Sequence, residues 1–171
     1  MSLTLVLGGA RSGKSRHAEE LVERHSPLWS YIATAHAYDE EMVERIALHR
    51  FRRSAGWQTI DAPDNPAEAV ATLPKGRPVL LDCLTLWLSN RMLADADIDA
   101  ESDALQAALL AHSGPVFVVS NEVGLGIVPD NALARRFRDA QGRLNQAIAA
   151  QADTVIFMIA GIPMQVKAPG K

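Results

Sequence analysis

The apolar residues of this chain gather in five short runs that do not alternate with polar residues. The runs are rich in valine, isoleucine and leucine. Uninterrupted runs of this length are typical of strands that are buried on both faces, as in a parallel sheet covered by helices. The predicted strands are residues 3–7, 31–35, 79–82, 116–120 and 154–160.

Segments with helical periodicity lie between these runs. Residues 131–150, for example, place Leu133, Phe137 and Leu144 in one apolar stripe. Strands that alternate with helices predict an α/β fold with a mostly parallel sheet. The predicted helices are residues 15–24, 40–53, 104–111 and 131–150, and the predicted loops are residues 61–66 and 93–103.

Length and composition limit the kind of protein that this chain can be. The 171 residues fit a single domain. A net charge of −3 gives no sign of general binding to nucleic acid or to a membrane surface. The one cysteine, Cys83, excludes an internal disulfide and a zinc site of several cysteines. No apolar stretch approaches the roughly 20 residues that cross a bilayer, so we expect a cytoplasmic protein.

The most specific motif follows the first predicted strand and opens the first predicted helix. It matches G-x-x-x-x-G-K-[ST], the phosphate-binding P-loop. Its glycines let the backbone fold around an anion, and its N–H groups point at the β-phosphate. Lys14 neutralises β- and γ-phosphate oxygens, and the Ser15 hydroxyl is placed to bind Mg²⁺. The motif therefore predicts one nucleotide-binding domain over residues 1–171, with a cradle of Gly8, Gly9, Ala10, Arg11, Ser12, Gly13, Lys14 and Ser15.

A carboxylate ends the third apolar run. Asp82 follows three apolar residues, which is the form of a Walker B site. An aspartate there holds Mg²⁺ directly or through water, so Ser15 and Asp82 are the predicted metal ligands. The alternative is an aspartate that caps a helix or shapes a turn. We expect the adjacent Cys83 to be a small buried residue, because no basic residue flanks it.

Two polar residues follow the fourth apolar run. Ligands of open α/β sheets bind at the carboxyl ends of the strands. Asn121 and Glu122 stand at such an end and are candidates for contact with the acceptor substrate or a catalytic water. The alternative is that both residues only shape a loop.

One histidine lies among arginines. If residues 40–53 form a helix, Arg45, Arg52 and Arg53 lie on the same side as His49. Neighbouring cations disfavour imidazolium, and a neutral imidazole is a nucleophile beside which arginines can bind phosphate. The alternative is a basic, solvent-exposed helix end that contains an incidental histidine.

Taken together, these segments resemble the bifunctional adenosylcobinamide kinase / adenosylcobinamide-phosphate guanylyltransferase family. The resemblance covers nearly the whole chain. It depends on the P-loop, on the helix of His49, on Leu-Asp-Cys-Leu-Thr-Leu-Trp at 81–87, and on Ser-Asn-Glu-Val-Gly-Leu-Gly-Ile-Val-Pro at 120–129. It implies an α/β fold of the P-loop NTPase type, a three-layer sandwich with a mostly parallel central sheet.

The resemblance also implies roles for single residues. His49 matches the residue that accepts GMP covalently, and Lys14 is the other implied catalytic residue. The family often has glutamate where this chain has Asp61, and a shorter carboxylate weakens or rearranges a contact to the nucleotide. The resemblance implies a homotrimer with a site shared between neighbouring chains. The nucleotide-binding residues that it implies beyond the P-loop are Ala33, Thr34, Ala35, Arg50, Phe51, Arg52, Arg53, Asp61 and Asp82.

The implied activity is a pair of reactions in cobalamin biosynthesis. The enzyme phosphorylates adenosylcobinamide with ATP or GTP, with Mg²⁺ as cofactor. It then transfers GMP from GTP through a guanylyl-histidine and releases adenosylcobinamide-GDP and pyrophosphate. The implied partners are a small corrinoid and nucleotides, with no nucleic acid and no membrane. The alternatives are a P-loop small-molecule kinase without a covalent intermediate and a non-catalytic nucleotide sensor.

Overall fold

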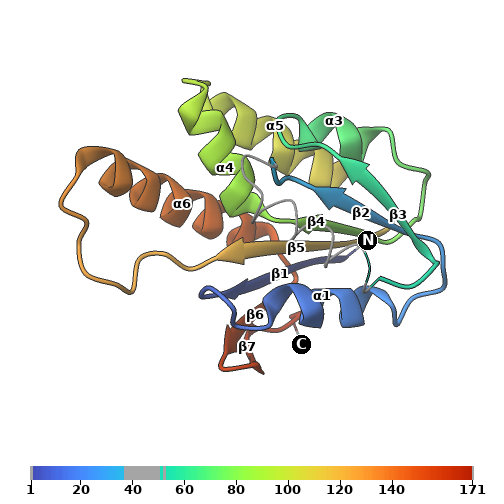
Figure 1. Cartoon of the computed structure of the whole chain (residues 1–171). Helices are drawn as coiled ribbons and strands as arrows, with labels where there is room; N and C mark the ends of the chain where they lie inside the picture. Colours follow the sequence, from blue (N-terminus) through green and yellow to red (C-terminus); the bar gives the residue numbers. More distant parts are fainter. Residues whose placement is uncertain (1, 37–50, 52, 171) are drawn as a thin grey trace.

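The computed structural model describes residues 2–36, 51 and 53–170 and contains a seven-stranded sheet in this part of the chain (Figure 1). The strand order is β3-β2-β4-β5-β1-β6-β7. All neighbouring strands are parallel except β6 and β7. The strands are β1 (Ser2–Gly8), β2 (Trp29–Ala33), β3 (Trp57–Asp61), β4 (Val79–Asp82), β5 (Pro115–Asn121), β6 (Thr154–Ile159) and β7 (Ile162–Lys167).

Helices cover both faces of the sheet, as Figure 1 shows. One face packs against α1 and the other against α3 to α6, with separate apolar clusters on the two sides. This arrangement confirms the predicted three-layer α/β fold with a mostly parallel sheet. None of the described helices is long and apolar enough to span a membrane. The helices are α1 (Lys14–Val22), α3 (Pro66–Ala71), α4 (Leu84–Leu93), α5 (Ile98–Ala111) and α6 (Ala132–Gln151).

Side chains along each strand alternate between the two helical layers. In β5, Val116 and Val118 belong to the cluster that contains α4, α5 and α6. Phe117 and Val119 belong to the cluster that contains α1. The same alternation decides which residues at the strand ends face α1.

The sequence located the five buried strands but missed β3, β7, α3 and α4. The predicted loop at 93–103 is wrong in its second half, because α5 already begins at Ile98. The side chain of Asp97 accepts a hydrogen bond from the Ala100 N–H, and Asp99 and Glu101 lie in the first turn. A capping aspartate and acidic residues near a helix N-terminus stabilise the helix start. The predicted helix at 40–53 falls almost entirely outside the described residues.

Candidate active site

The predicted site residues gather where the parallel strands end. Asp61 of β3 and Asp82 of β4 both lie opposite Ala33 of β2. Gly8 of β1 lies opposite Asn121 of β5, next to β4 in the sheet. The carboxyl ends of the neighbouring strands β4, β5 and β1 therefore bring Asp82, Asn121 and the P-loop to the same end of the sheet.

The P-loop joins β1 to α1 through two residues in the left-handed region. Gly13 caps α1 with φ +89°, and Arg11 has φ +55°. No described side chain caps the first turn of α1, so its N–H groups suit an anion. The Lys14 ammonium donates a hydrogen bond to the Gly9 carbonyl at 3.1 Å. The Gly161 N–H donates a hydrogen bond to the Ser12 carbonyl, which attaches the P-loop to the turn between β6 and β7.

Gly8 is a P-loop glycine that leaves no room for a side chain. A Cβ at this position would lie 2.5 Å from Ser12 Oγ and 2.9 Å from the Met158 carbonyl oxygen. A Cβ at Gly9 would meet no protein atom within 4 Å. Gly8→Ala should therefore lower the free energy of unfolding by about 1–3 kcal/mol, as overpacking does. Gly9→Ala is the matched control, and equal denaturant midpoints for the two variants would contradict this account.

Asp82 is linked to the segment after residue 51 through Tyr31. The Tyr31 hydroxyl donates to Asp82 Oδ2 at 2.8 Å, and the Arg53 guanidinium carbon lies 3.6 Å from the Tyr31 ring centroid. Burial, followed by the charge of Asp82, raises the pKa of Tyr31 well above its usual range. The phenol therefore stays protonated at neutral pH and donates to the Asp82 carboxylate. Arg53 and Asp82 are predicted site residues, whereas no role was predicted for Tyr31.

Ser15 and Asp82 suit the chemistry of Mg²⁺. Ser15 lies in the first turn of α1, and Asp82 ends β4 on the face that packs against α1. In the described part of the chain, no three His, Cys, Asp or Glu side chains gather as a metal site. Mg²⁺ commonly takes one or two protein oxygens and completes its octahedron with water and phosphate. A hydroxyl and a carboxylate near the P-loop fit such a site.

Thr34 fastens two strand ends together. Its hydroxyl donates to the Cys83 carbonyl at 2.7 Å and accepts from the Cys83 N–H at 2.8 Å. The Thr34 carbonyl accepts from Asn90 Nδ2 at 2.9 Å, and the residue is fully buried. Its hydroxyl therefore holds β2 beside β4 instead of facing a ligand. Ala33 and Ala35 offer only backbone groups to a nucleotide, and that contact stays a prediction.

Cys83 is a buried thiol with no sign of nucleophilic activation. Burial, followed by the charge of Asp82, raises its pKa to about 11. A thiol with this pKa stays protonated at neutral pH, and the thiolate is the reactive form. The structure therefore agrees with the predicted small buried residue.

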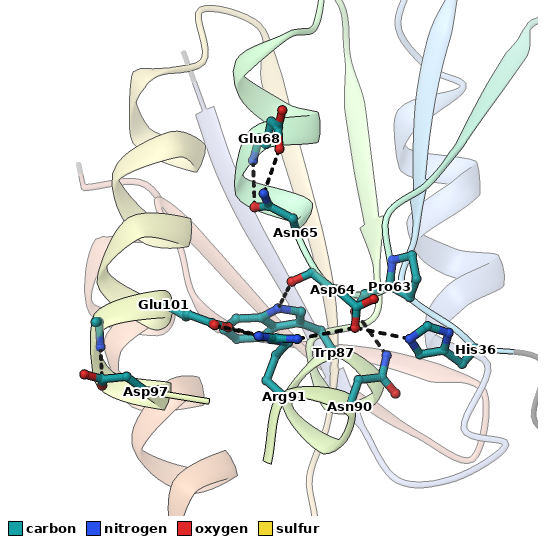
Figure 2. Close-up of polar contacts among 11 residues, drawn as sticks. His36, Pro63, Asp64, Asn65, Glu68, Trp87, Asn90, Arg91, Asp97 and Glu101 are labelled. Atoms are coloured by element: carbon teal, nitrogen blue, oxygen red, sulfur yellow. Dashed lines mark hydrogen bonds and ion pairs between the residues drawn. The ribbon is translucent and has the colours of Figure 1, made fainter. Parts of the chain in front are cut away.

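A series of charged and polar contacts connects segments that follow the carboxyl ends of the strands, as Figure 2 shows. His36 Nε2 lies 3.2 Å from Asp64 Oδ1, and Arg91 Nη1 lies 3.5 Å from the same oxygen. Arg91 also donates to both oxygens of Glu101, at 2.8 and 2.9 Å. These contacts join the segment after β2 to the loop before α3 and to α4 and α5.

Asn121 and Glu122 differ in their surroundings. The Glu122 N–H donates to the Gly8 carbonyl at 3.1 Å, and its carboxylate accepts from the N–H groups of Gly124 and Leu125. That carboxylate therefore shapes its own loop. Asn121 follows Val119 in the alternation along β5, so its side chain faces α1 and the P-loop. Its Oδ1 atom is buried, and no described residue donates to it.

The remaining predicted residues are only partly within the described structure. Asp61 ends β3 and is exposed, and the Phe51 side chain is 90% exposed. His49, Arg50 and Arg52 lie outside the described residues. The roles of all five stay predictions.

Known proteins resemble this chain over almost its whole length. Residues 4–166 match a family model described as cobinamide kinase / cobinamide phosphate guanyltransferase. The bifunctional adenosylcobalamin biosynthesis protein CobP of Pseudomonas aeruginosa is 49% identical, covering 95% of this chain and 96% of the relative. The bifunctional adenosylcobalamin biosynthesis protein CobU of Salmonella typhimurium is 40% identical, covering 96% and 99%.

A solved structure with little sequence similarity shares the fold. It is an ATPase from the type III secretion system of pathogenic bacteria, with a TM-score of 0.56 and 14% identity. The likeness covers 96% of this chain and 56% of the ATPase. This level of identity supports the α/β architecture alone.

Proposed function

The chain belongs to the cobinamide kinase / cobinamide phosphate guanyltransferase family, and on that premise we propose that it catalyses two successive reactions. The first phosphorylates adenosylcobinamide with ATP or GTP. The second converts adenosylcobinamide phosphate and GTP into adenosylcobinamide-GDP and pyrophosphate. The observation that carries the proposal is the P-loop with its Lys14. The loop follows β1 at the end of the sheet where β4 ends in Asp82 and β5 ends in Asn121.

In the first reaction, a hydroxyl oxygen on the aminopropanol arm of adenosylcobinamide attacks the γ-phosphorus. The bond from that phosphorus to the bridging oxygen breaks, and the nucleoside diphosphate leaves. Lys14 and the N–H groups at the start of α1 stabilise the charge that develops on the phosphate oxygens. Mg²⁺, when bound by Ser15 and Asp82, neutralises charge on the same phosphates.

In the second reaction, His49 attacks the α-phosphorus of GTP and expels pyrophosphate. A phosphate oxygen of adenosylcobinamide phosphate then attacks the guanylyl-histidine, and His49 is released. Covalent catalysis divides one difficult transfer into two easier steps. Arg53, four positions after His49 in the sequence, contacts Tyr31, and Tyr31 is bonded to Asp82. These contacts connect Arg53 to the end of β4 that carries Asp82, on the face of the sheet that packs against α1.

We also propose the homotrimer that the family resemblance implies. Ile162, Met164 and Val166 of β7 are apolar side chains that are at least half exposed. Neighbouring exposed apolar residues mark surfaces that another protein covers. We propose that these residues contact a second copy of the chain. The molar mass of the protein in solution tests this part of the proposal.

The mass of the corrinoid after each reaction tests the proposal. Purified protein is incubated with adenosylcobinamide, ATP and Mg²⁺, GTP is added next, and the corrinoid mass is measured after each addition. We expect one phosphoryl group after the first step and one further GMP after the second. Phosphorylation without GMP transfer would favour the single-function kinase, and no change in either step would contradict the proposed function.

Asp82→Asn is expected to weaken the response of the kinase reaction to Mg²⁺. The change removes one negative charge beside the proposed metal and keeps the size of the side chain. We expect the Mg²⁺ concentration for half-maximal rate to rise at least about tenfold, in the range found when metal sites lose a supporting group. Asp139→Asn, an exposed change on α6, is the matched control. An unchanged Mg²⁺ titration for Asp82→Asn would show that Asp82 is not a metal ligand.

A further inference from the structure

Four polar side chains form a buried cluster beneath the end of β5. The strand-end cluster consists of Thr85 of α4, Ser120 of β5, and Gln141 and Asn145 of α6, none more than 8% exposed. Ser120 Oγ donates to Asn145 Oδ1 at 2.7 Å. Gln141 Nε2 donates to the same oxygen at 2.9 Å and to Ser120 Oγ at 3.0 Å. Buried polar groups lower stability unless they are paired, and the Gln141 Oε1 atom has no partner among the described residues, so this cluster has a cost that apolar side chains would not have.

The strand-end cluster pairs the backbone of Asn121 where the neighbouring strand has ended. β4 stops at Asp82, which lies opposite Val119, so the sheet offers Asn121 no partner on that side. Thr85 Oγ1 accepts from the Asn121 N–H at 2.8 Å, and Asn145 Nδ2 donates to the Asn121 carbonyl at 3.0 Å. Because buried peptide groups need partners, these two side chains replace the missing strand.

These bonds fix the direction of the Asn121 side chain. Ser120 points into the strand-end cluster, so Asn121 points to the opposite face, toward α1 and the P-loop. Its Oδ1 atom is buried without a donor among the described residues. A carboxamide oxygen can only accept, and a buried acceptor without a partner is destabilising. A ligand hydroxyl at this edge can supply the donor that this oxygen lacks among the described residues.

We propose that Thr85 and Asn145 are positioning residues for the kinase reaction, and that Asn121 accepts a hydrogen bond from the attacking hydroxyl of the corrinoid alcohol. This inference rests on the proposed function and extends it. The hydroxyl oxygen bonds to the γ-phosphorus, the bond to the bridging oxygen breaks, and the nucleoside diphosphate leaves with the electron pair. The hydroxyl proton passes to water, because a carboxamide is too weak a base to take it. Asn121 orients the nucleophile and does no proton transfer.

The test removes the Thr85 hydroxyl without changing the volume of the side chain. Thr85→Val deletes the acceptor of the Asn121 N–H, whereas Thr85→Ser keeps it. We expect Thr85→Val to lower kcat for phosphorylation of adenosylcobinamide up to about a hundredfold, the cost of a misplacement of about 1 Å. The KM for ATP should stay close to the wild-type value, because the P-loop is untouched. Thr85→Ser should recover most of the lost kcat.

Two further variants complete the experiment. Gln106→Leu removes a buried amide of α5 that donates to the Ser102 carbonyl, and it should leave kcat unchanged. Asn121→Ala deletes the carboxamide and keeps the backbone bonds, so it should lower kcat even if Thr85→Val does not fold. Wild-type kcat in Thr85→Val or Asn121→Ala, or equal losses in Thr85→Ser and Thr85→Val, would overturn the inference and leave the proposed function standing. A wild-type protein that phosphorylates no corrinoid would remove the proposed function and this inference with it.

Discussion

Lys14→Ala is expected to abolish nucleotide-dependent phosphorylation while the protein stays folded. The Lys14 ammonium is bonded to the Gly9 carbonyl within the P-loop, and Lys14 belongs to neither apolar core cluster. Its loss removes the cation that neutralises the β- and γ-phosphates, which no neighbouring neutral group can replace. We expect the rate of adenosylcobinamide phosphorylation to fall at least about a hundredfold, the typical effect of one deleted electrostatic stabiliser.

The control for this change is a second lysine. Lys75 is exposed in the connection between α3 and β4, and Lys75→Ala should behave as wild type. Thermal unfolding of both variants would establish that Lys14→Ala keeps its fold. Folded Lys14→Ala that phosphorylates adenosylcobinamide near the wild-type rate would show that the P-loop has another role.

His49→Ala is expected to separate the two activities. Guanylyl transfer should fall at least about a thousandfold, because removal of a catalytic nucleophile has effects of that size or larger. Phosphorylation of adenosylcobinamide should survive, because that step depends on the P-loop, Mg²⁺ and the acceptor hydroxyl. The two rates are measured separately, one with adenosylcobinamide and ATP and the other with adenosylcobinamide phosphate and GTP.

His25→Ala serves as the matched histidine control. The His25 ring lies 5.7 Å from the Phe117 ring, at the far end of α1 from the P-loop, and both rates should be kept. Arg53→Ala should slow the guanylyl transfer without removing the site of attachment. Guanylyl transfer at the wild-type rate in His49→Ala would exclude this histidine as the nucleophile.

The sequence predicted the buried part of the fold better than its edges. The central strands are apolar on both faces, so their runs are visible without any knowledge of the partners. β3 lies at the edge of the sheet, and Trp57 and Ile60 are its only apolar residues, so no apolar run marks it. α4 was missed because its buried residues include the polar Thr85 and Asn90, whereas the apolar Leu86 and Leu93 are not among them, so apolar and polar residues do not separate onto two helical faces.

For the site, local motifs were readable and long-range pairs were not. The P-loop is a contiguous motif whose spacing alone predicts its chemistry. Tyr31 and Asp82 are 51 positions apart, and Asn121 and Asn145 are 24 apart, so nothing local pairs them. A buried tyrosine needs a partner for its hydroxyl, which was the one available signal for Tyr31.

The covalent intermediate is the central claim, and the intact mass of the protein tests it most directly. Wild-type protein is incubated with GTP and Mg²⁺ without any corrinoid, and its mass and peptide map are recorded. We predict a gain of one GMP per chain, located on the peptide that contains His49. The bond should be lost in acid and kept in alkali, as expected for a phosphorus–nitrogen bond to histidine. An unmodified wild-type protein, or an equal mass gain in His49→Ala, would contradict the account.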